Sequence, residues 1–296
     1  MWSKKIPFAP FEYVSVSNQE DTGEHIFIHM QKTVKPLLIA ALLMTACTKL
    51  PEPEPVENPR VVILMYHRLT EGPAGNLYER SSAEFEKDLI YLRDNNISVI
   101  DFSELGSVVS GEKVLTTHAA VITFDDGDHS WYTIAAPLLK RYRMKATFFL
   151  WASKIGMDSF LTWEEIARLN SYTRDGGIRP FSFGSHTMSH QYLMNMKAAL
   201  GGGAPFTAYL DEELGGSKRL IENNIRGIVD ALALPYGDGA GDEEIISAAR
   251  RHGYSFIRTS ERNVTGTSSS DLFRLPSLPL LDITGQDIIG DYLGIQ

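Results

Sequence analysis

Two adjacent carboxylates follow an apolar run, where residues 121–127 read VITFDDG. Burying Asp125 and Asp126 together is unfavourable because like charges raise one another's pKa, and a bound divalent cation removes that cost. Successive side chains at the end of a strand diverge, so one carboxylate can bind a metal while the other faces a water molecule. The structural alternative is a helix cap followed by a turn aspartate. This motif alone leaves both interpretations open.

Two histidines four residues apart form a second candidate site, where residues 183–190 read FGSHTMSH. His186 and His190 can lie on one side of a helical turn, close enough to share a metal. Such a pair also arises by chance. Two histidines and one carboxylate would leave coordination positions open for water and substrate, which is typical of catalytic metal sites.

A third motif is the turn at residues 233–238, which reads ALPYGD. Proline fixes the backbone and glycine permits a sharp turn, so a backbone N–H near Tyr236 could face a substrate oxygen. Such a turn is common and means little by itself.

Each motif follows a predicted β-strand, which places all three at strand ends. Several of the strands are almost continuously apolar, as expected of strands covered on both faces. The predicted strands are Val61–Tyr66, Ile97–Asp101, Ala120–Phe124, Lys145–Leu150, Phe181–Ser185, Val229–Leu234 and Tyr254–Arg258.

Helical patterns alternate with these strands. We expect Ser82 to cap one helix, Thr162 to open another with a capping box, and Asp242 to open a third. The glycine-containing stretch Ala198–Phe206 is predicted to be a flexible loop. Repeated strand–helix units indicate an α/β fold, a parallel (β/α) barrel that is incomplete and seven-stranded, with a doubly wound open sheet as the alternative.

Taken in this order, the three motifs resemble those of the NodB-homology polysaccharide deacetylases, carbohydrate esterase family four. The resemblance extends over residues 61–296, and is greatest to exported deacetylases of poly-β-1,6-N-acetylglucosamine. It implies that Asp126, His186 and His190 hold a divalent metal, usually Zn²⁺. It also implies that Asp125 is the general base for the metal-bound water and that the Tyr236 backbone N–H stabilises the oxyanion.

The sequence departs from the family pattern in two places. Many members carry an arginine where this chain has Ala233, and we consider Arg274 as its replacement beside Asp125. Many also end with Leu-x-x-His, whose histidine protonates the leaving amine, whereas no histidine follows Leu280 here. His67, at the end of the first predicted strand, is our substitute for the general acid. The alternative is that His67 is structural, with its ring hydrogen-bonded to nearby backbone groups.

Composition narrows the possible functions. The 296 residues carry a net charge of −9, which excludes the diffuse basic surface of a non-specific nucleic-acid binder. A single cysteine, Cys47, excludes an intramolecular disulfide and a multi-cysteine zinc module.

The first sixty residues do not read as part of the folded domain. Residues 30–46 combine two lysines with a short apolar run and precede Cys47, which resembles a bacterial lipoprotein signal peptide whose cysteine is lipidated. Residues 1–29 then lie upstream of the expected true start. Residues 47–60, rich in proline and glutamate, predict an extended tether.

We therefore expect a metal-dependent hydrolase that removes N-acetyl groups from a GlcNAc-containing polysaccharide. It would act as a monomer in the bacterial envelope or outside the cytoplasm, lipid-anchored to a membrane (the outer membrane in a Gram-negative cell). An O-acetyl esterase or small-amide hydrolase using the same site is one alternative. A catalytically inactive glycan-binding surface lipoprotein is the other.

The lipid anchor can be tested at Cys47. Replacing Cys47 with Ala should move the protein from the membrane into a soluble exported fraction, because the acyl chains that hold it would be lost. Fractionation of cells expressing either form measures this. Unchanged membrane association of the variant would contradict the lipoprotein interpretation.

Overall fold

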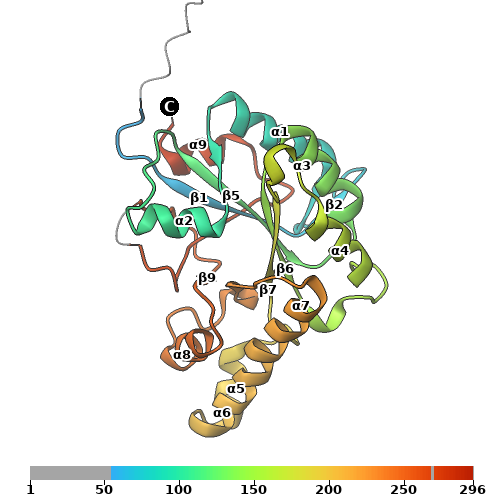
Figure 1. Cartoon of the computed structure of the whole chain (residues 1–296), viewed down its shortest axis with the longest axis vertical. Helices are drawn as coiled ribbons and strands as arrows, with labels where there is room; N and C mark the ends of the chain where they lie inside the picture. Colours follow the sequence, from blue (N-terminus) through green and yellow to red (C-terminus); the bar gives the residue numbers. More distant parts are fainter. Residues whose placement is uncertain (1–54, 268–269, 296) are drawn as a thin grey trace, which may run out of the picture. The chain divides into compact units, whose positions relative to one another are not determined.

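A curled sheet of parallel strands forms the centre of the fold (Figure 1). The structure is a computed structural model that describes residues 55–267 and 270–295. The predicted signal peptide, the residues before it and Cys47 lie outside this part of the chain. Within it, no helix combines the length and the apolar character that crossing a bilayer requires.

From β1 to β9 the strands follow chain order in one direction around the sheet, with β4 to one side and β10 next to β1. The order is β10-β1-β5-β6-β7-β8-β9, and β4 pairs with the beginning of β5. The main strands are β1 (Val61–Tyr66), β4 (Ser98–Val99), β5 (Ala119–Asp126), β6 (Ala146–Leu150), β7 (Phe181–Ser185), β8 (Ala231–Ala233), β9 (Phe256–Arg258) and β10 (Leu278–Pro279).

An irregular segment, and not a full strand, closes the barrel between β9 and β1. Ile257 exchanges backbone hydrogen bonds with Leu272 and Leu275, and a few residues later β10 pairs with β1. This is the predicted incomplete parallel barrel. The doubly wound alternative is wrong, because the strand order from β1 to β9 does not reverse direction as a doubly wound sheet requires.

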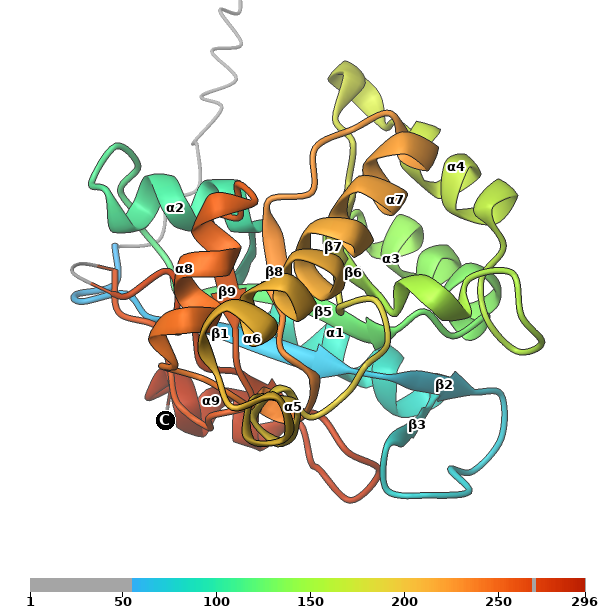
Figure 2. The ribbon, with the colours of Figure 1, turned by 90° about the horizontal axis from the view of Figure 1, so that it is seen from below.

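All seven predicted strands are present, several shortened by one to three residues. Sequence reasoning missed β10 and a small parallel pair, β2 (Arg68–Thr70) and β3 (Glu79–Ser81), which lies beyond the end of β1 (Figure 2). These strands have two or three residues each, too few to show a periodic pattern.

Helices pack around the curled sheet. They are α1 (Ser82–Asp94), α2 (Phe102–Val109), α3 (Ala136–Tyr142), α4 (Trp163–Ser171), α5 (Leu193–Leu200), α6 (Gly203–Leu210), α7 (Ser217–Ile225), α8 (Glu243–Arg251) and α9 (Asp287–Leu293). Two π-helical segments, η1 (Trp131–Ala135) and η4 (Asp211–Gly216), precede α3 and join α6 to α7.

The predicted helix starts at Thr162 and Asp242 are confirmed, since both side chains accept hydrogen bonds from the first turn. The predicted cap at Ser82 is wrong by one residue: Ser81 accepts the bond from Glu84 N. A serine is common at either position, so the pattern alone did not separate them.

The predicted loop at Ala198–Phe206 is also wrong. α5 extends to Leu200 and α6 begins at Gly203, so only a two-residue link remains. Phe206 and Leu210 are fully buried, and this burial outweighs the low helix propensity of the glycines.

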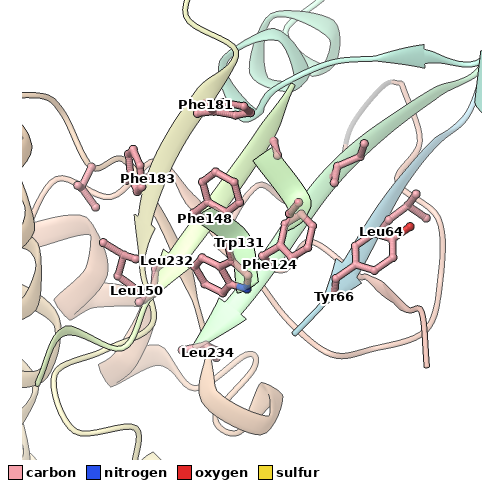
Figure 3. Close-up of a cluster of buried hydrophobic side chains, with 14 of the residues drawn as sticks. Leu64, Tyr66, Phe124, Trp131, Phe148, Leu150, Phe181, Phe183, Leu232 and Leu234 are labelled. Atoms are coloured by element: carbon pink, nitrogen blue, oxygen red, sulfur yellow. The ribbon is translucent and has the colours of Figure 1, made fainter. Parts of the chain in front are cut away.

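Two apolar clusters hold the sheet. The larger fills the space between the outer face of the sheet and its helices, and includes the aromatic rings of Phe124, Trp131 and Phe148 (Figure 3). The smaller lies on the opposite face of the strands, where α2 contributes Phe102 and Leu105. Because side chains alternate along a strand, Asp125 points to this second, inner face together with Val121.

Strand register brings the carboxyl ends of the strands level with one another. Asp126 of β5 lies opposite Leu150 of β6, which lies opposite Ser185 of β7. Ala233 at the end of β8 lies opposite Arg258 at the end of β9. The three motifs follow β5, β7 and β8, so the register places them on one rim.

A buried ion pair ties the C-terminal segment to this framework. Arg80 Nε and Nη2 each donate to Asp88 at 2.6 Å, and Arg80 Nη1 donates to the carbonyls of Leu281 and Thr284. Both charged side chains are at most 1% exposed. The pair therefore joins β3, α1 and the chain that follows β10.

Asp88→Ala should lower the free energy of unfolding by about 3–5 kcal/mol, because Arg80 would stay buried without its counter-charge. Lys87→Ala removes an exposed pair with Glu84 on the same helix and should change stability by less than about 1 kcal/mol. Urea unfolding of both variants measures the difference. Similar small changes in both would contradict the structural importance of the pair.

Candidate active site

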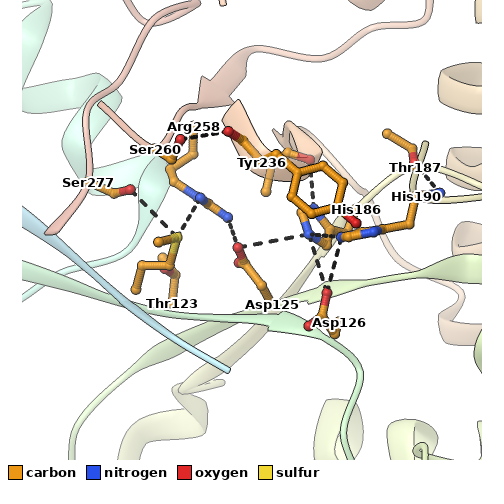
Figure 4. Close-up of polar contacts among 12 residues, drawn as sticks. Thr123, Asp125, Asp126, His186, Thr187, His190, Tyr236, Arg258, Ser260 and Ser277 are labelled. Carbon is orange, nitrogen blue, oxygen red and sulfur yellow. Dashed lines mark hydrogen bonds and ion pairs between the residues drawn. The ribbon is translucent and has the colours of Figure 1, made fainter. Parts of the chain in front are cut away.

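All six residues predicted to act in catalysis or metal binding line one cavity of about 560 Å³ at the rim of the sheet. They are Asp125, Asp126, His186, His190, Tyr236 and His67. Figure 4 shows the first five of them. The cavity also contains Tyr78, Trp151 and Arg258, which sequence reasoning did not assign.

The predicted metal ligands converge on one point. His186 Nε2 lies 3.0 Å from His190 Nε2, and Asp126 Oδ1 lies 3.5 Å and 3.3 Å from these two nitrogens. In the described part of the chain, these three residues form a group whose ligand atoms all lie within 4.8 Å of one another. Asp126 comes from the end of β5, and both histidines come from the turn after β7, about sixty residues later.

Hydrogen bonding leaves the coordinating nitrogen of His186 free of a proton. Its Nδ1 lies 2.9 Å from the carbonyl oxygen of Ala233, which can only accept, so Nδ1 carries the hydrogen. Burial lowers the pKa of His186 to about 4, despite the nearby carboxylates of Asp125 and Asp126. At neutral pH the ring is uncharged and Nε2 presents a lone pair, the form that binds metals.

Asp126 supplies an ionised oxygen at the same point. Burial acts to raise its pKa, but the neighbouring imidazoles of His190, His186 and His67 outweigh burial and hold the pKa below its usual range. Its buried Oδ1 accepts no hydrogen bond from the described residues. An unpaired carboxylate oxygen facing two imidazole nitrogens fits a divalent cation with mixed N and O ligands.

Backbone strain is concentrated at these residues. Asp126, Thr187, His190 and Tyr236 all have positive φ, at 90°, 63°, 56° and 60° respectively. Non-glycine residues rarely adopt this conformation, and it is common at functional sites. These positive φ values therefore lie in the turns that carry the predicted site residues.

A buried glutamate fixes the turn between the two histidines. Glu213 of η4 accepts hydrogen bonds from the Ser189 amide at 2.9 Å and the Ser189 hydroxyl at 2.6 Å. Its backbone carbonyl also accepts from the Met188 amide. The sequence carried no signal for this contact, because Glu213 lies on a helix distant along the chain.

Aromatic rings hold His190 from two sides. Trp151 stacks on its ring, with centroids 4.6 Å apart and an interplanar angle of 22°, and Tyr236 contacts it edge-on at 4.8 Å. These contacts restrict the rotation of the imidazole and form part of the cavity wall.

Asp125 has a different partner from Asp126. Its Oδ2 accepts a hydrogen bond from Arg258 Nη2, and both side chains are almost fully buried. The guanidinium also lies over the ring of Phe149, 5.4 Å from its centroid. Asp125 Oδ1 is buried and has no hydrogen-bond partner among the described residues, and Oδ2 also lies 3.9 Å from His186 Nε2.

The expectation that Arg274 lies beside Asp125 is wrong. Arg274 is exposed and pairs with Glu261 at 2.7 Å. Arg258 takes the position because it is an inward-facing residue of β9, directly opposite Ala233 on β8. An arginine at the end of an apolar strand was the sequence signal that could have identified it.

The turn after β8 presents the predicted backbone donor. The amides of Gly237 and Asp238 donate to Leu234 and Pro235, whereas the Tyr236 N–H has no acceptor within the part of the chain that the structure describes. Gly237 is required here, because its φ is +69° and a Cβ would lie 2.1 Å from Ser260 Oγ.

His67 lies at the predicted level of the rim. Tyr66 is opposite Phe124, so the next residues, His67 and Asp125, lie at the same level. The His67 carbonyl accepts from Trp131 Nε1 at 2.7 Å, and its ring contacts that of Tyr78. Ile283 stands three residues after Leu280, where the Leu-x-x-His pattern would have its histidine, and its side chain is 82% exposed.

Comparison with known proteins identifies the family. A sequence profile described as polysaccharide deacetylase matches residues 113–257. YxkH of Bacillus subtilis (strain 168), which carries the name of a polysaccharide deacetylase, is 31% identical over 212 residues, covering 72% of this chain and 67% of that protein. The poly-β-1,6-N-acetyl-D-glucosamine N-deacetylase of Staphylococcus aureus (strain MRSA252) is 25% identical over 222 residues, covering 74% and 73%.

Solved structures share the fold. The Streptococcus pyogenes deacetylase PplD, solved with acetate, superposes with a TM-score of 0.68 at 20% identity, covering 80% of this chain and 99% of that one. IcaB from Ammonifex degensii gives a TM-score of 0.62 at 23% identity, covering 78% and 94%.

The chain therefore belongs to the polysaccharide deacetylase family, as the motifs predicted. It is a deacetylase of the hydrolase class, related to the poly-β-1,6-N-acetylglucosamine deacetylases.

Arg258→Met should lower the free energy of unfolding by about 3–5 kcal/mol, because Asp125 would remain buried without its counter-charge. Turnover should fall with it, since the carboxylate loses the group that orients it. Arg274→Met, which removes an exposed arginine, is the matched control and should leave both quantities nearly unchanged. Equal effects of the two substitutions, measured by urea unfolding and acetate release, would contradict this assignment.

Proposed function

We propose that this chain removes N-acetyl groups from a GlcNAc-containing polysaccharide of the bacterial envelope or extracellular matrix. One observation carries the proposal: three ligand atoms from Asp126, His186 and His190 converge beside the buried carboxylate of Asp125, on the wall of an open cavity. The name of the Staphylococcus aureus relative supports N-acetylglucosamine as the sugar.

Asp126, His186 and His190 would hold a divalent metal, and two imidazoles with one carboxylate favour zinc. Such a metal acts as a Lewis acid on a carbonyl oxygen and lowers the pKa of water. Three protein ligands leave positions open for water and substrate, as a catalytic site requires.

Asp125 is the proposed general base. Its carboxylate lies beside the proposed ligands, with Oδ2 3.9 Å from His186 Nε2, and would take a proton from the attacking water while Arg258 orients it. The water oxygen bonds to the acetyl carbon, and the Tyr236 N–H donates to the oxygen that gains negative charge. The C–N bond then breaks, and acetate and a protonated amine leave.

The proton for the leaving amine has two candidate sources. His67 lines the same cavity and is one of them. Asp125 is the other, because it holds the proton taken from water and can return it. We favour His67 as the acid only if its removal strongly reduces turnover.

For the N-terminal region, we propose a signal peptide at 30–46, a lipid on Cys47 and a tether over 47–60, of which the structure describes residues 55–60. This organisation would anchor a monomeric enzyme to the membrane, in contact with acetylated polysaccharide. The positive and apolar character of the signal segment supports it.

Acetate release tests the function directly. The purified protein is incubated, with and without zinc, with poly-β-1,6-GlcNAc, chitooligosaccharides, acetylxylan and a small acetamide. Zinc-dependent acetate release from a GlcNAc polymer is the expected result. Preference for acetylxylan or the small amide would favour the alternative hydrolases, and bound zinc with no acetate from any substrate would favour an inactive glycan-binding protein.

Substitution separates the roles of the two aspartates. Asp126→Asn should weaken metal binding, because a neutral amide is a poorer ligand. Asp125→Asn should keep the metal and lower turnover by about 10²–10⁴-fold, because the base is lost.

His67→Ala on the same assays tells the two proton donors apart, since it should cost little if Asp125 returns the proton. Metal content and acetate release are measured on all three variants. Loss of metal in Asp125→Asn, or turnover near that of the unmodified protein, would contradict the mechanism.

A further inference from the structure

The turn that carries both proposed histidine ligands has an unfavourable backbone conformation. Thr187 and His190 have φ of 63° and 56°, which non-glycine residues rarely adopt. One local hydrogen bond supports it, from the His190 amide to the Thr187 hydroxyl at 3.1 Å (Figure 4). Such a conformation persists only where the surrounding structure stabilises it, so contacts from elsewhere in the fold must contribute.

The π-helical segment η4 supplies several of these contacts. Glu213 is 4% exposed, and its two carboxylate oxygens accept separately from the Ser189 amide and the Ser189 hydroxyl. Its backbone carbonyl accepts from the Met188 amide. One residue of η4 therefore fixes two consecutive residues of the turn through three hydrogen bonds.

The local geometry of η4 makes the bond to Met188 possible. In an α-helix the Glu213 carbonyl would accept from the amide of Ser217, four residues further on. Here the Ser217 amide donates to the Leu214 carbonyl instead. The Glu213 carbonyl is left to accept from the Met188 amide and from the Ser217 hydroxyl at 2.6 Å. π-Helical segments of this kind are frequent at functional sites.

Ser217, the first residue of α7, extends this support to Thr187. Its hydroxyl lies 2.8 Å from the hydroxyl of Ser185, which accepts from the Thr187 amide at 3.1 Å. Both serines are fully buried. Together, η4 and the start of α7 hold all three residues that separate the two histidines.

We propose that Glu213 is a positioning residue for the metal, because it holds the turn in the conformation that brings His190 Nε2 to within 3.0 Å of His186 Nε2. Without its side chain the turn relaxes into other conformations. Zinc then binds only the fraction of molecules in the competent form, which raises the apparent Kd. This inference rests on the proposed metal site and adds to it a residue that is not itself a ligand.

Zinc affinity of the purified full chain tests the role of Glu213. Glu213→Ala should raise the zinc Kd by about 10–100-fold, the usual effect of removing a group that orients metal ligands. Glu213→Gln should restore most of the affinity, because its amide can accept from the Ser189 N–H and donate to the Ser189 hydroxyl oxygen. Competition with a chromophoric chelator measures Kd, and circular dichroism checks that each variant is folded.

Two further variants complete the experiment. Glu212→Ala, at the exposed neighbouring position on η4, is the matched control and should leave the zinc Kd unchanged. Ser189→Ala removes only the hydroxyl bond to Glu213 and should raise the Kd by about three- to tenfold. It decides the question if Glu213→Ala does not fold.

A purely structural role of Glu213 would lower stability without changing the zinc Kd of the folded protein. An unchanged Kd in folded Glu213→Ala or in Ser189→Ala would therefore overturn the inference. Equally weak binding by Glu213→Gln and Glu213→Ala would also overturn it, since the effect would then depend on charge and not on hydrogen bonding. Failure of the metal-dependent function is a different result, because the unmodified chain and Glu212→Ala would then bind no zinc.

Discussion

The fold of the site follows from the crowding of two carboxylates at the end of one strand. Asp125 and Asp126 are neighbours in a low-dielectric setting, and each would raise the other's pKa unless it had its own positive or metal partner. Their main partners differ: Asp125 pairs with the guanidinium of Arg258, whereas Asp126, whose φ is positive, faces two imidazoles. His186 Nε2 also lies 3.9 Å from Asp125 Oδ2.

The position of the Asp125–Arg258 pair depends on the packing of the strands beneath the rim. A Cβ at Gly184 would lie 2.4 Å from the Phe149 ring, so only glycine on β7 lets that ring lie where it does. The ring in turn lies under the guanidinium of Arg258. Ala233, opposite Arg258, is small enough to leave the space that an arginine on β8 would otherwise fill. The inner face of the barrel is therefore shaped around the Asp125–Arg258 pair.

The sequence was most informative where chemistry and local structure occur together. The carboxylate pair, the histidine pair and the strand preceding each were predictable from a few adjacent residues. Arg258 was not assigned, because its partner lies 133 residues away and on another strand. Glu213 was missed for a similar reason, since a contact between a helix and the His186–His190 turn exists only after folding. The glycines near Gly201 predicted a loop, but the burial of Phe206 determines the local structure.

We propose above all that Asp126, His186 and His190 hold the catalytic metal while Asp125 stays free to act as the base. Anomalous diffraction at the zinc edge, from crystals of the zinc-loaded protein, tests it most directly. We expect one zinc ion bound by two imidazole nitrogens and an Asp126 oxygen at about 2.0–2.2 Å, with Asp125 hydrogen-bonded to Arg258 and not coordinated to the metal. Zinc at another position, or coordinated by Asp125 in place of Asp126, would contradict it.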